Sequence, residues 1–282
     1  MTTTYESPLT TFNDGNTIPQ LGYGVWKVKD DVAEKVVGLA FEAGYRHIDT
    51  ARIYGNEAGV GRAIAASGLD SKDLFITTKV WNSDQGYQQT LEAFDASMER
   101  LGLDTLDLFL IHWLQPKQGK HVETWKALVE LQKSGRVRSI GVCNFTIEAL
   151  REIEEATGVA PAIHQVETHP YFPQRELRDY EASRGIVHQS WSPLGQGSDL
   201  LSNPALADIA AKHGATPAQV VIAWHLALGN VVIPKSETPS RIVENWQSLA
   251  VTLDDADVAA INGLDRGAEG RIGPNPAESD FE

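Results

Sequence analysis

One local pattern recurs along the whole chain: a helix-like stretch ends in glycine, and a short apolar, β-branched run follows within a few residues. Glycine adopts the left-handed backbone conformation just past a helix C-terminus without steric cost. The glycines that fit this position are Gly44, Gly68, Gly102, Gly135, Gly158, Gly185 and Gly229. The pattern predicts helices and strands that alternate from one end of the chain to the other.

The runs after these glycines are short and mostly apolar, as is typical of strands buried on both faces. They are RHID (46–49), LFITTKV (74–80), LDLFLIH (106–112), RSIGVCN (138–144), IHQVE (163–167), IVHQSW (186–191) and NVVIPK (230–235). The run LGYGVW (21–26) precedes the first helix and brings the predicted strands to eight. Ahead of it, the stretch NDGN (13–16) has the composition of a β-hairpin turn.

Eight alternating strands fit either a closed barrel or a doubly wound open sheet. A dinucleotide-binding doubly wound fold places G-x-G-x-x-G directly after its first strand, whereas this chain offers only Gly22 and Gly24 there. A length of 282 residues allows one or two domains, and no linker or composition break divides the chain. We therefore predict one domain over residues 1–282, a single (β/α)8 TIM barrel with an N-terminal β-hairpin.

Charge and cysteine content narrow the choice of partner and compartment. Twenty-four Lys and Arg against 38 Asp and Glu give a net charge of −14, which argues against nucleic acid as the main partner. The one cysteine, Cys143, cannot form an intramolecular disulfide, which suits a reducing compartment. The start MTTTYESPLT lacks signal-peptide features, and the apolar run 220–228 falls short of the roughly 20 residues that cross a bilayer. We expect a cytoplasmic protein without a membrane partner.

Polar residues stand at the ends of three neighbouring strand runs. In a barrel the active site lies at the C-terminal ends of the strands, where this sequence has Asp49, Lys79 and His112, with Tyr54 shortly after the first. Singly, each has a structural explanation: a cap, a lysine reaching solvent, a hydrogen-bonded core histidine or a packed tyrosine. Together they predict a site, because a lysine in an apolar strand needs a nearby opposite charge, and Asp49 can supply it.

These four side chains suit proton transfer to a carbonyl group. An ammonium near a tyrosine stabilises the phenolate and lowers the tyrosine pKa from about 10. Asp49 would hold Lys79 in place, and His112 would hydrogen-bond the reacting oxygen. The set contains no activated serine, no CxxC motif and no metal cage.

Several separated motifs in the same order resemble the aldo-keto reductases over essentially the whole chain, in particular the compact bacterial 2,5-diketo-D-gluconate reductase type. They are GYRHIDTARIYGNE (44–57), LFITTKVW (74–81), LDLFLIHW (106–113), SIGVCNF (139–145) and IPKSETPSRIVEN (233–245). The resemblance implies a catalytic tetrad of Asp49, Tyr54, Lys79 and His112. It also implies a monomer that reduces small aldehydes or ketones to alcohols with NADPH, with Tyr54 as the general acid.

The same resemblance implies a set of cofactor contacts. Nicotinamide's carboxamide would be held by Asn144, Gln165 and Cys143; a serine is usual at position 143, and a thiol donates more weakly. Trp191 would stack on the nicotinamide. The loop SPLGQGSDL (192–200) would wrap the pyrophosphate, with contacts from Ser192, Leu194, Gly195 and Gln196.

The adenosine end bears on the choice between NADP and NAD. The resemblance places Lys235, Ser236 and Arg241 at the 2′-phosphate, and Glu244 and Asn245 at the adenine. Thr238-Pro239 is typical of a helix start, which would also favour an anion. The carboxylate of residue Glu237 opposes that charge, so we expect a preference for NADPH with some use of NADH.

Aromatic residues at strand C-termini predict the substrate cleft. Trp26, Trp81, Trp113 and Trp191 all lie there, and with Tyr23 they would line an apolar pocket above Tyr54. The loop 114–121 and the tail 266–282 would shape specificity. Sugar ketoacids, dicarbonyls related to methylglyoxal and aromatic aldehydes all fit such a cleft.

Three alternatives compete with this interpretation. A metal-dependent hydrolase barrel could use His47 and Asp49 together with His112, His164 and His169, but it gives Lys79 and Tyr54 no role. The pair Tyr23 and Lys27 resembles that of short-chain dehydrogenases only by coincidence, because it lies on the first strand. An NADPH-binding sensor with slow turnover is the third alternative, and the complete tetrad speaks against it.

Overall fold

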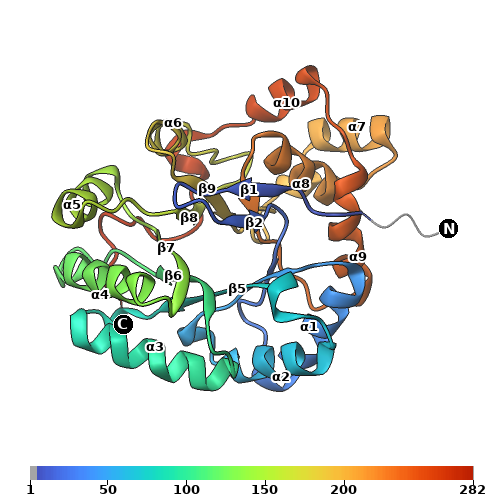
Figure 1. Cartoon of the computed structure of the whole chain (residues 1–282). Helices are drawn as coiled ribbons and strands as arrows, with labels where there is room; N and C mark the ends of the chain where they lie inside the picture. The colour runs from blue at the N-terminus through green and yellow to red at the C-terminus, as the bar shows by residue number, and fades with distance from the viewer. Residues whose placement is uncertain (1–4, 282) are drawn as a thin grey trace.

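The N-terminal hairpin closes one end of the molecule in a computed structural model that describes residues 5–281. Strands β1 (Leu9–Thr11) and β2 (Thr17–Pro19) pair antiparallel, as predicted from the NDGN turn. Asn13 donates to the carbonyl of Pro161 at 2.9 Å, and Asn16 donates to that of Arg138 at 3.2 Å. Because Pro161 and Arg138 lie where two barrel strands begin, the hairpin covers the N-terminal end of the barrel (Figure 1).

Eight parallel strands pair in chain order, which confirms the predicted barrel. They are β3 (Tyr23–Gly24), β4 (His47–Asp49), β5 (Phe75–Val80), β6 (Leu106–Ile111), β7 (Val137–Cys143), β8 (Ile163–Glu167), β9 (Val187–Trp191) and β10 (Val231–Val232). The two edges of the sheet meet beside β3 and β10. There the Gly22 N–H donates to the Val232 carbonyl at 2.9 Å, and the Val232 N–H donates to the Gln20 carbonyl at 2.8 Å.

Helices follow the strands around the barrel (Figure 1). They are α1 (Asp30–Ala43), α2 (Glu57–Ser67), α3 (Tyr87–Leu101), α4 (His121–Lys133), α5 (Ile147–Thr157), α6 (Arg175–Ser183), α7 (Pro204–His213), α8 (Pro217–Ala227), α9 (Pro239–Gln247) and α10 (Asp255–Asn262). Short 3-10 turns lie at Arg52–Tyr54, Ser71–Asp73, Asn82–Asp84, Leu200–Ser202, Ser248–Ala250 and Gly267–Gly270. The seven predicted glycines all have positive φ, between 67° and 120°, and each stands between a helix and the next strand.

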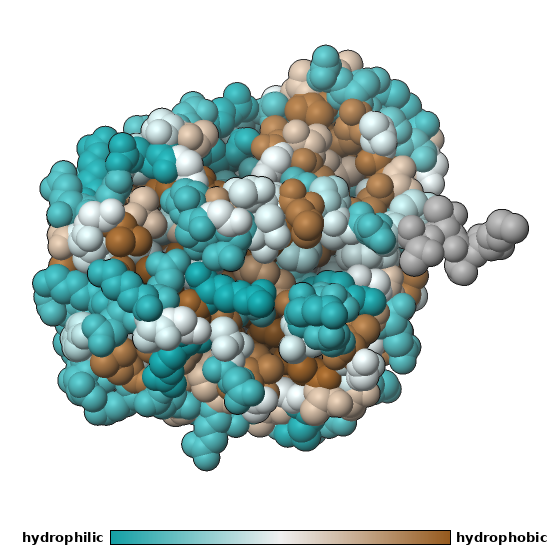
Figure 2. Space-filling view, in the orientation of Figure 1, coloured by the Kyte–Doolittle hydropathy of each residue, from teal (hydrophilic) through white to brown (hydrophobic). Residues whose placement is uncertain are grey.

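Strand β6 shows why these runs are apolar on both faces. Leu108 and Leu110 belong to the cluster inside the barrel, whereas Phe109 and Ile111 belong to the larger cluster beneath the helices. Phe109 packs edge-on against Phe94 of α3, with ring centroids 5.0 Å apart. Hydrophilic side chains cover most of the face in Figure 2. Within residues 5–281, no helix has both the length and the apolar character that a membrane crossing requires.

Candidate active site

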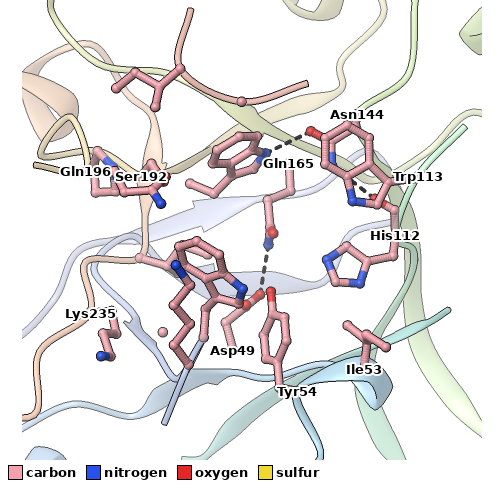
Figure 3. Close-up of a pocket in the computed structure, with 18 of the residues that line it drawn as sticks. Asp49, Ile53, Tyr54, His112, Trp113, Asn144, Gln165, Ser192, Gln196 and Lys235 are labelled. Carbon is pink, nitrogen blue, oxygen red and sulfur yellow. Dashed lines mark hydrogen bonds between the residues drawn. The ribbon is translucent and has the colours of Figure 1, made fainter. Parts of the chain in front are cut away.

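A cavity of about 810 Å³ opens at the C-terminal ends of the strands. Its floor and walls come from strand ends, from the loops that follow them and from the C-terminal tail (Figure 3). Of the predicted residues, it is lined by Trp26, Asp49, Tyr54, Trp81, His112, Trp113, Asn144, Gln165, Trp191, Ser192, Leu194, Gln196 and Lys235. Lys79 lies directly beneath, bonded to Asp49.

Lys79 and Asp49 form a buried ion pair across two neighbouring strands. The Lys79 ammonium donates to Asp49 Oδ1 at 2.6 Å and to the Thr50 carbonyl at 2.8 Å. Asp49 Oδ2 accepts from Gln165 Nε2 at 2.8 Å. Burial by itself lowers the pKa of Lys79, but the Asp49 carboxylate and other nearby groups outweigh it and raise that pKa above its usual value. The lysine is therefore charged at neutral pH.

Tyr54 ends the 3-10 turn Arg52–Tyr54 after β4, and Figure 3 shows its hydroxyl pointing into the cavity. The Lys79 ammonium lies 5.2 Å from the centre of its ring. Burial raises the pKa of Tyr54 to about 12, and Lys79 only partly opposes this rise. The expectation of a lowered tyrosine pKa is therefore wrong for this structure, because loss of hydration outweighs the attraction of one ammonium.

His112 directly follows β6, and its ring lies between two aromatic side chains. Its centroid is 5.6 Å from that of Tyr54 and 5.1 Å from that of Trp81. Burial, with a further contribution from Lys79, lowers the pKa of His112 well below its usual value. Its buried Nδ1 has no hydrogen-bond partner among the described residues. A neutral imidazole therefore lines the cavity.

Two side-chain amides stand on the cavity wall in fixed orientations. Asn144, with φ of 55°, accepts from Trp191 Nε1 at 2.8 Å and donates to the His112 carbonyl at 3.0 Å. Gln165 Nε2 also donates to Gln189 Oε1 at 3.0 Å. The structure does not bring Cys143 to this wall: its side chain is fully buried among the apolar residues inside the barrel.

The loop after β9 and the segment after β10 form the far side of the cavity. Ser192 and Gln196 have φ of 48° and 36°, and Gly195 between them has φ of 72°. Gly195 itself does not line the cavity, and a Cβ there would approach Ser198 Oγ to 2.6 Å. Lys235 forms an ion pair with Glu237 at 2.6 Å. The carboxylate that was expected to oppose the positive charge therefore contacts the predicted phosphate-binding lysine.

The remaining predicted adenosine contacts lie outside the cavity. Ser236 is buried, and its hydroxyl accepts from the N–H of Thr238, the N-cap of α9. Proline at the first turn confirms the predicted helix start, and Arg241 is exposed there. Glu244 accepts from Thr216 Oγ1 at 2.7 Å, at the start of α8. Asn245 is buried in α9.

The four tryptophans predicted from the sequence do line the cavity, but Tyr23 does not. Its ring packs against Tyr45 with centroids 5.6 Å apart, and its hydroxyl donates to the Ser236 carbonyl. Successive residues of a strand face opposite sides, so Gly24 rather than Tyr23 faces the cavity. The assignment of Tyr23 to the substrate pocket is not supported by its position.

Other lining residues were not singled out individually in the sequence, although the tail 266–282 as a whole was expected to shape specificity. The tail contributes Ile272, Gly273, Pro274 and Phe281, and the turn before Tyr54 contributes Ile53. Phe281 packs 5.0 Å from Trp113 and 6.1 Å from Trp81, measured between ring centroids. Only the alternation of Gln165 and Glu167 on one face of β8 could have drawn attention to a further buried polar residue at this end.

The histidines considered as metal ligands are dispersed. His47 Nδ1 lies 3.3 Å from the Pro19 carbonyl, at the hairpin end of the barrel. His164 donates to Glu181 at 2.6 Å and His169 donates to Glu167 at 3.0 Å. Across residues 5–281, no three His, Cys, Asp or Glu side chains gather in a way that could hold a metal ion.

Comparison with known proteins gives a consistent result. The model of the aldo/keto reductase family matches residues 19–266. A protein of Mycolicibacterium smegmatis named aldo-keto reductase is 53% identical over 98% of this chain and 99% of its own length. Methylglyoxal reductase DkgA of Escherichia coli is 47% identical over 93% of this chain and 94% of its own length. The solved structure of a Gox0644 mutant in complex with NADPH has a TM-score of 0.94 and 48% identity, covering 98% of this chain and 100% of that chain.

The barrel, the buried lysine–aspartate pair beneath a tyrosine and a histidine, and these matches over nearly the full chain lead to one conclusion. The protein belongs to the aldo/keto reductase family.

Proposed function

We propose that this protein reduces aldehydes and ketones to alcohols, reversibly, with NADPH as its cofactor. The observation that carries the proposal is the Lys79–Asp49 pair beneath Tyr54, with a neutral His112 beside it, at the floor of a cavity of about 810 Å³. Relatives named methylglyoxal reductase and a neighbour solved with NADPH support the same reaction.

The side chains around the cavity fit a nicotinamide cofactor. The amides of Asn144 and Gln165 can pair with a carboxamide, the indole of Trp191 offers an aromatic face, and Lys235 supplies a positive charge at the far side. When bound, NADPH would supply the hydride that reaches the carbonyl carbon. We assign the loop residues Ser192, Leu194, Gly195 and Gln196 to the pyrophosphate, Lys235, Ser236 and Arg241 to the 2′-phosphate, and Glu244 and Asn245 to the adenine.

This chain's own residues handle the proton. With a pKa of about 12, Tyr54 is protonated at neutral pH and can donate its proton to the carbonyl oxygen. The tyrosinate left behind is stabilised by the Lys79 ammonium, which Asp49 keeps charged and in place. His112 orients the oxygen by hydrogen bonding, and the tryptophans exclude water from the reaction.

Replacing Tyr54 by phenylalanine tests this assignment. The ring and its contact with His112 remain, and only the acidic hydroxyl is lost. General acid catalysis is typically worth about 100- to 10,000-fold, so carbonyl-dependent NADPH consumption should fall by that factor while NADPH binding, followed by protein fluorescence, persists. Tyr87→Phe is a matched control, because that hydroxyl meets Glu130 on the surface. Near-normal turnover by Tyr54→Phe would overturn the assignment.

A substrate panel distinguishes this proposal from a regulatory role. Dicarbonyls, sugar ketoacids and aromatic aldehydes should be assayed with NADPH and NADH in parallel. Efficient turnover of one class supports the reductase, whereas slow turnover of every class, together with a stable complex with another protein, favours an NADPH sensor. The proposal includes one catalytic unit over residues 1–282, a monomer, and a cytoplasmic location that suits the free, buried Cys143.

A further inference from the structure

Residues 266–281, here called the tail strap, cross the end of the barrel that carries the cavity. The strap begins where the Arg266 N–H donates to the Tyr171 carbonyl at 3.0 Å and the Arg266 guanidinium lies 3.4 Å from the centre of the Tyr171 ring. Gly270 lies so close to the same carbonyl that a Cβ would not fit. The start of the strap is therefore docked on the loop that follows β8.

Glu167 holds the next two residues of the strap. Its side chain is 1% exposed at the end of β8, and it does not line the cavity. Glu167 Oε1 accepts from the Ile272 N–H at 2.6 Å, and Oε2 accepts from the Gly273 N–H at 2.7 Å. His169 Nε2 donates to Oε1 at 3.0 Å. An ionised carboxylate can accept all three bonds, and bonds to a charged acceptor are the strong ones.

This attachment determines where the strap meets the cavity. Gly273 is held so close to Trp191 that a Cβ would come within 2.5 Å of its ring. At its other end the strap packs Phe281 against Trp113. The Phe281 carbonyl accepts from Asn82 Nδ2 at 2.8 Å. The strap thus spans the substrate side of the cavity between Glu167 and Asn82, which are both buried, and of these two anchors only Glu167 is charged.

We propose that Glu167 is a positioning residue for the carbonyl substrate: its carboxylate fixes the tail strap as a wall of the pocket and thereby favours small carbonyl compounds. The inference rests on the proposed reductase function. Loosening the anchor releases the wall without touching Tyr54, Lys79 or His112. The consequence is weaker binding of a small substrate, with its chemistry and the cofactor site preserved.

The test replaces Glu167 by glutamine, which keeps the size but puts an NH₂ where one backbone N–H needs an acceptor. With methylglyoxal as the probe, KM should rise about tenfold, the change expected from one lost bond to a charged group. The kcat value and the dissociation constant of NADPH should stay within about twofold of the wild type. That change is smaller than the one expected from the loss of one such hydrogen bond. Hydrogen exchange at the Ile272 and Gly273 amides should accelerate. Asp107→Asn is the matched control: this buried carboxylate accepts from the Ile76 N–H at the opposite end of the barrel, and its loss should leave KM unchanged.

A second pair of variants keeps the proposal testable if the glutamine variant does not fold. Ile272→Pro removes the N–H from which Glu167 accepts a hydrogen bond, whereas Ile272→Ala keeps that N–H and shortens only the side chain, which lines the cavity. Proline should raise KM well above the alanine value, and combining it with Glu167→Gln should give less than the product of the two effects.

Three results would overturn the positioning role: unchanged KM and amide exchange in Glu167→Gln, a loss confined to kcat or NADPH binding, or equal effects of proline and alanine at Ile272. A wild type that reduces no carbonyl would refute the proposed function instead, and amide exchange would still report on the anchor.

Discussion

Replacing Asp49 by asparagine would isolate the charge of the buried pair from its shape. Asparagine keeps an oxygen that can accept from Lys79, but among residues 5–281 no other carboxylate lies within 4.0 Å of that ammonium. Breaking a buried ion pair by removing one partner costs about 3–5 kcal/mol. The alternative for the protein is to deprotonate Lys79 at pH 7, which costs about 5 kcal/mol for a group with an ordinary pKa near 10.4. Both routes predict a loss of about 3–5 kcal/mol in the free energy of unfolding.

The loss in unfolding free energy caused by Asp49→Asn should depend on pH. In the wild type Asp49 raises the pKa of Lys79, so the pair's contribution is complete below about pH 10.4 and is lost only as pH rises beyond it. In Asp49→Asn the main charge that opposes burial is gone, so burial lowers the lysine pKa and the unfolded chain holds the proton more tightly. The variant should therefore gain stability as pH rises toward about 10.4.

Urea denaturation at neutral pH and near pH 9.5 measures the unfolding free energies of the wild type and of Asp49→Asn. The difference in unfolding free energy between wild type and variant should shrink by up to about 3 kcal/mol over that interval, at about 1.4 kcal/mol per pH unit. Turnover should also fall, because the tyrosinate of Tyr54 loses its stabilising cation. A gap that stays constant with pH, or a variant as stable as the wild type at neutral pH, would refute the reasoning.

The remaining predictions concern the cofactor and the barrel base. Arg241→Ala should weaken NADPH far more than NADH in fluorescence titrations, and equal losses would show that the 2′-phosphate lies elsewhere. Glu237→Gln should release Lys235 from its 2.6 Å ion pair and tighten NADPH, by less at high salt; no change at low salt would contradict it. Burial raises the pKa of Asp107 from 3.8 to about 6, so its ionisation costs stability as pH rises through that range. Asp107→Asn should therefore be up to about 3 kcal/mol more stable at pH 7.5 and show no gain near pH 4 in urea denaturation.

Local signals predicted the framework and much of the candidate site. Each helix-ending glycine, apolar strand and strand-end polar residue acts within a few positions of the chain, so the barrel, the Lys79–Asp49 pair and the start of α9 could all be anticipated. The tryptophans at strand ends followed from the same logic. The position of Tyr23 could not be predicted in this way, because the side of a two-residue strand that faces the cavity depends on how the barrel closes.

Tertiary structure alone decided the electrostatics and the pocket wall. Burial, which no spacing encodes, raises the pKa of Tyr54 to about 12 despite the neighbouring lysine. It also encloses Cys143 inside the barrel, so that this residue does not line the cavity. The sequence of the tail strap shows no periodicity that would place it. Its position rests on bonds between Glu167 and amides 105 and 106 residues further along the chain. Such contacts exist only once the barrel has brought the two segments together.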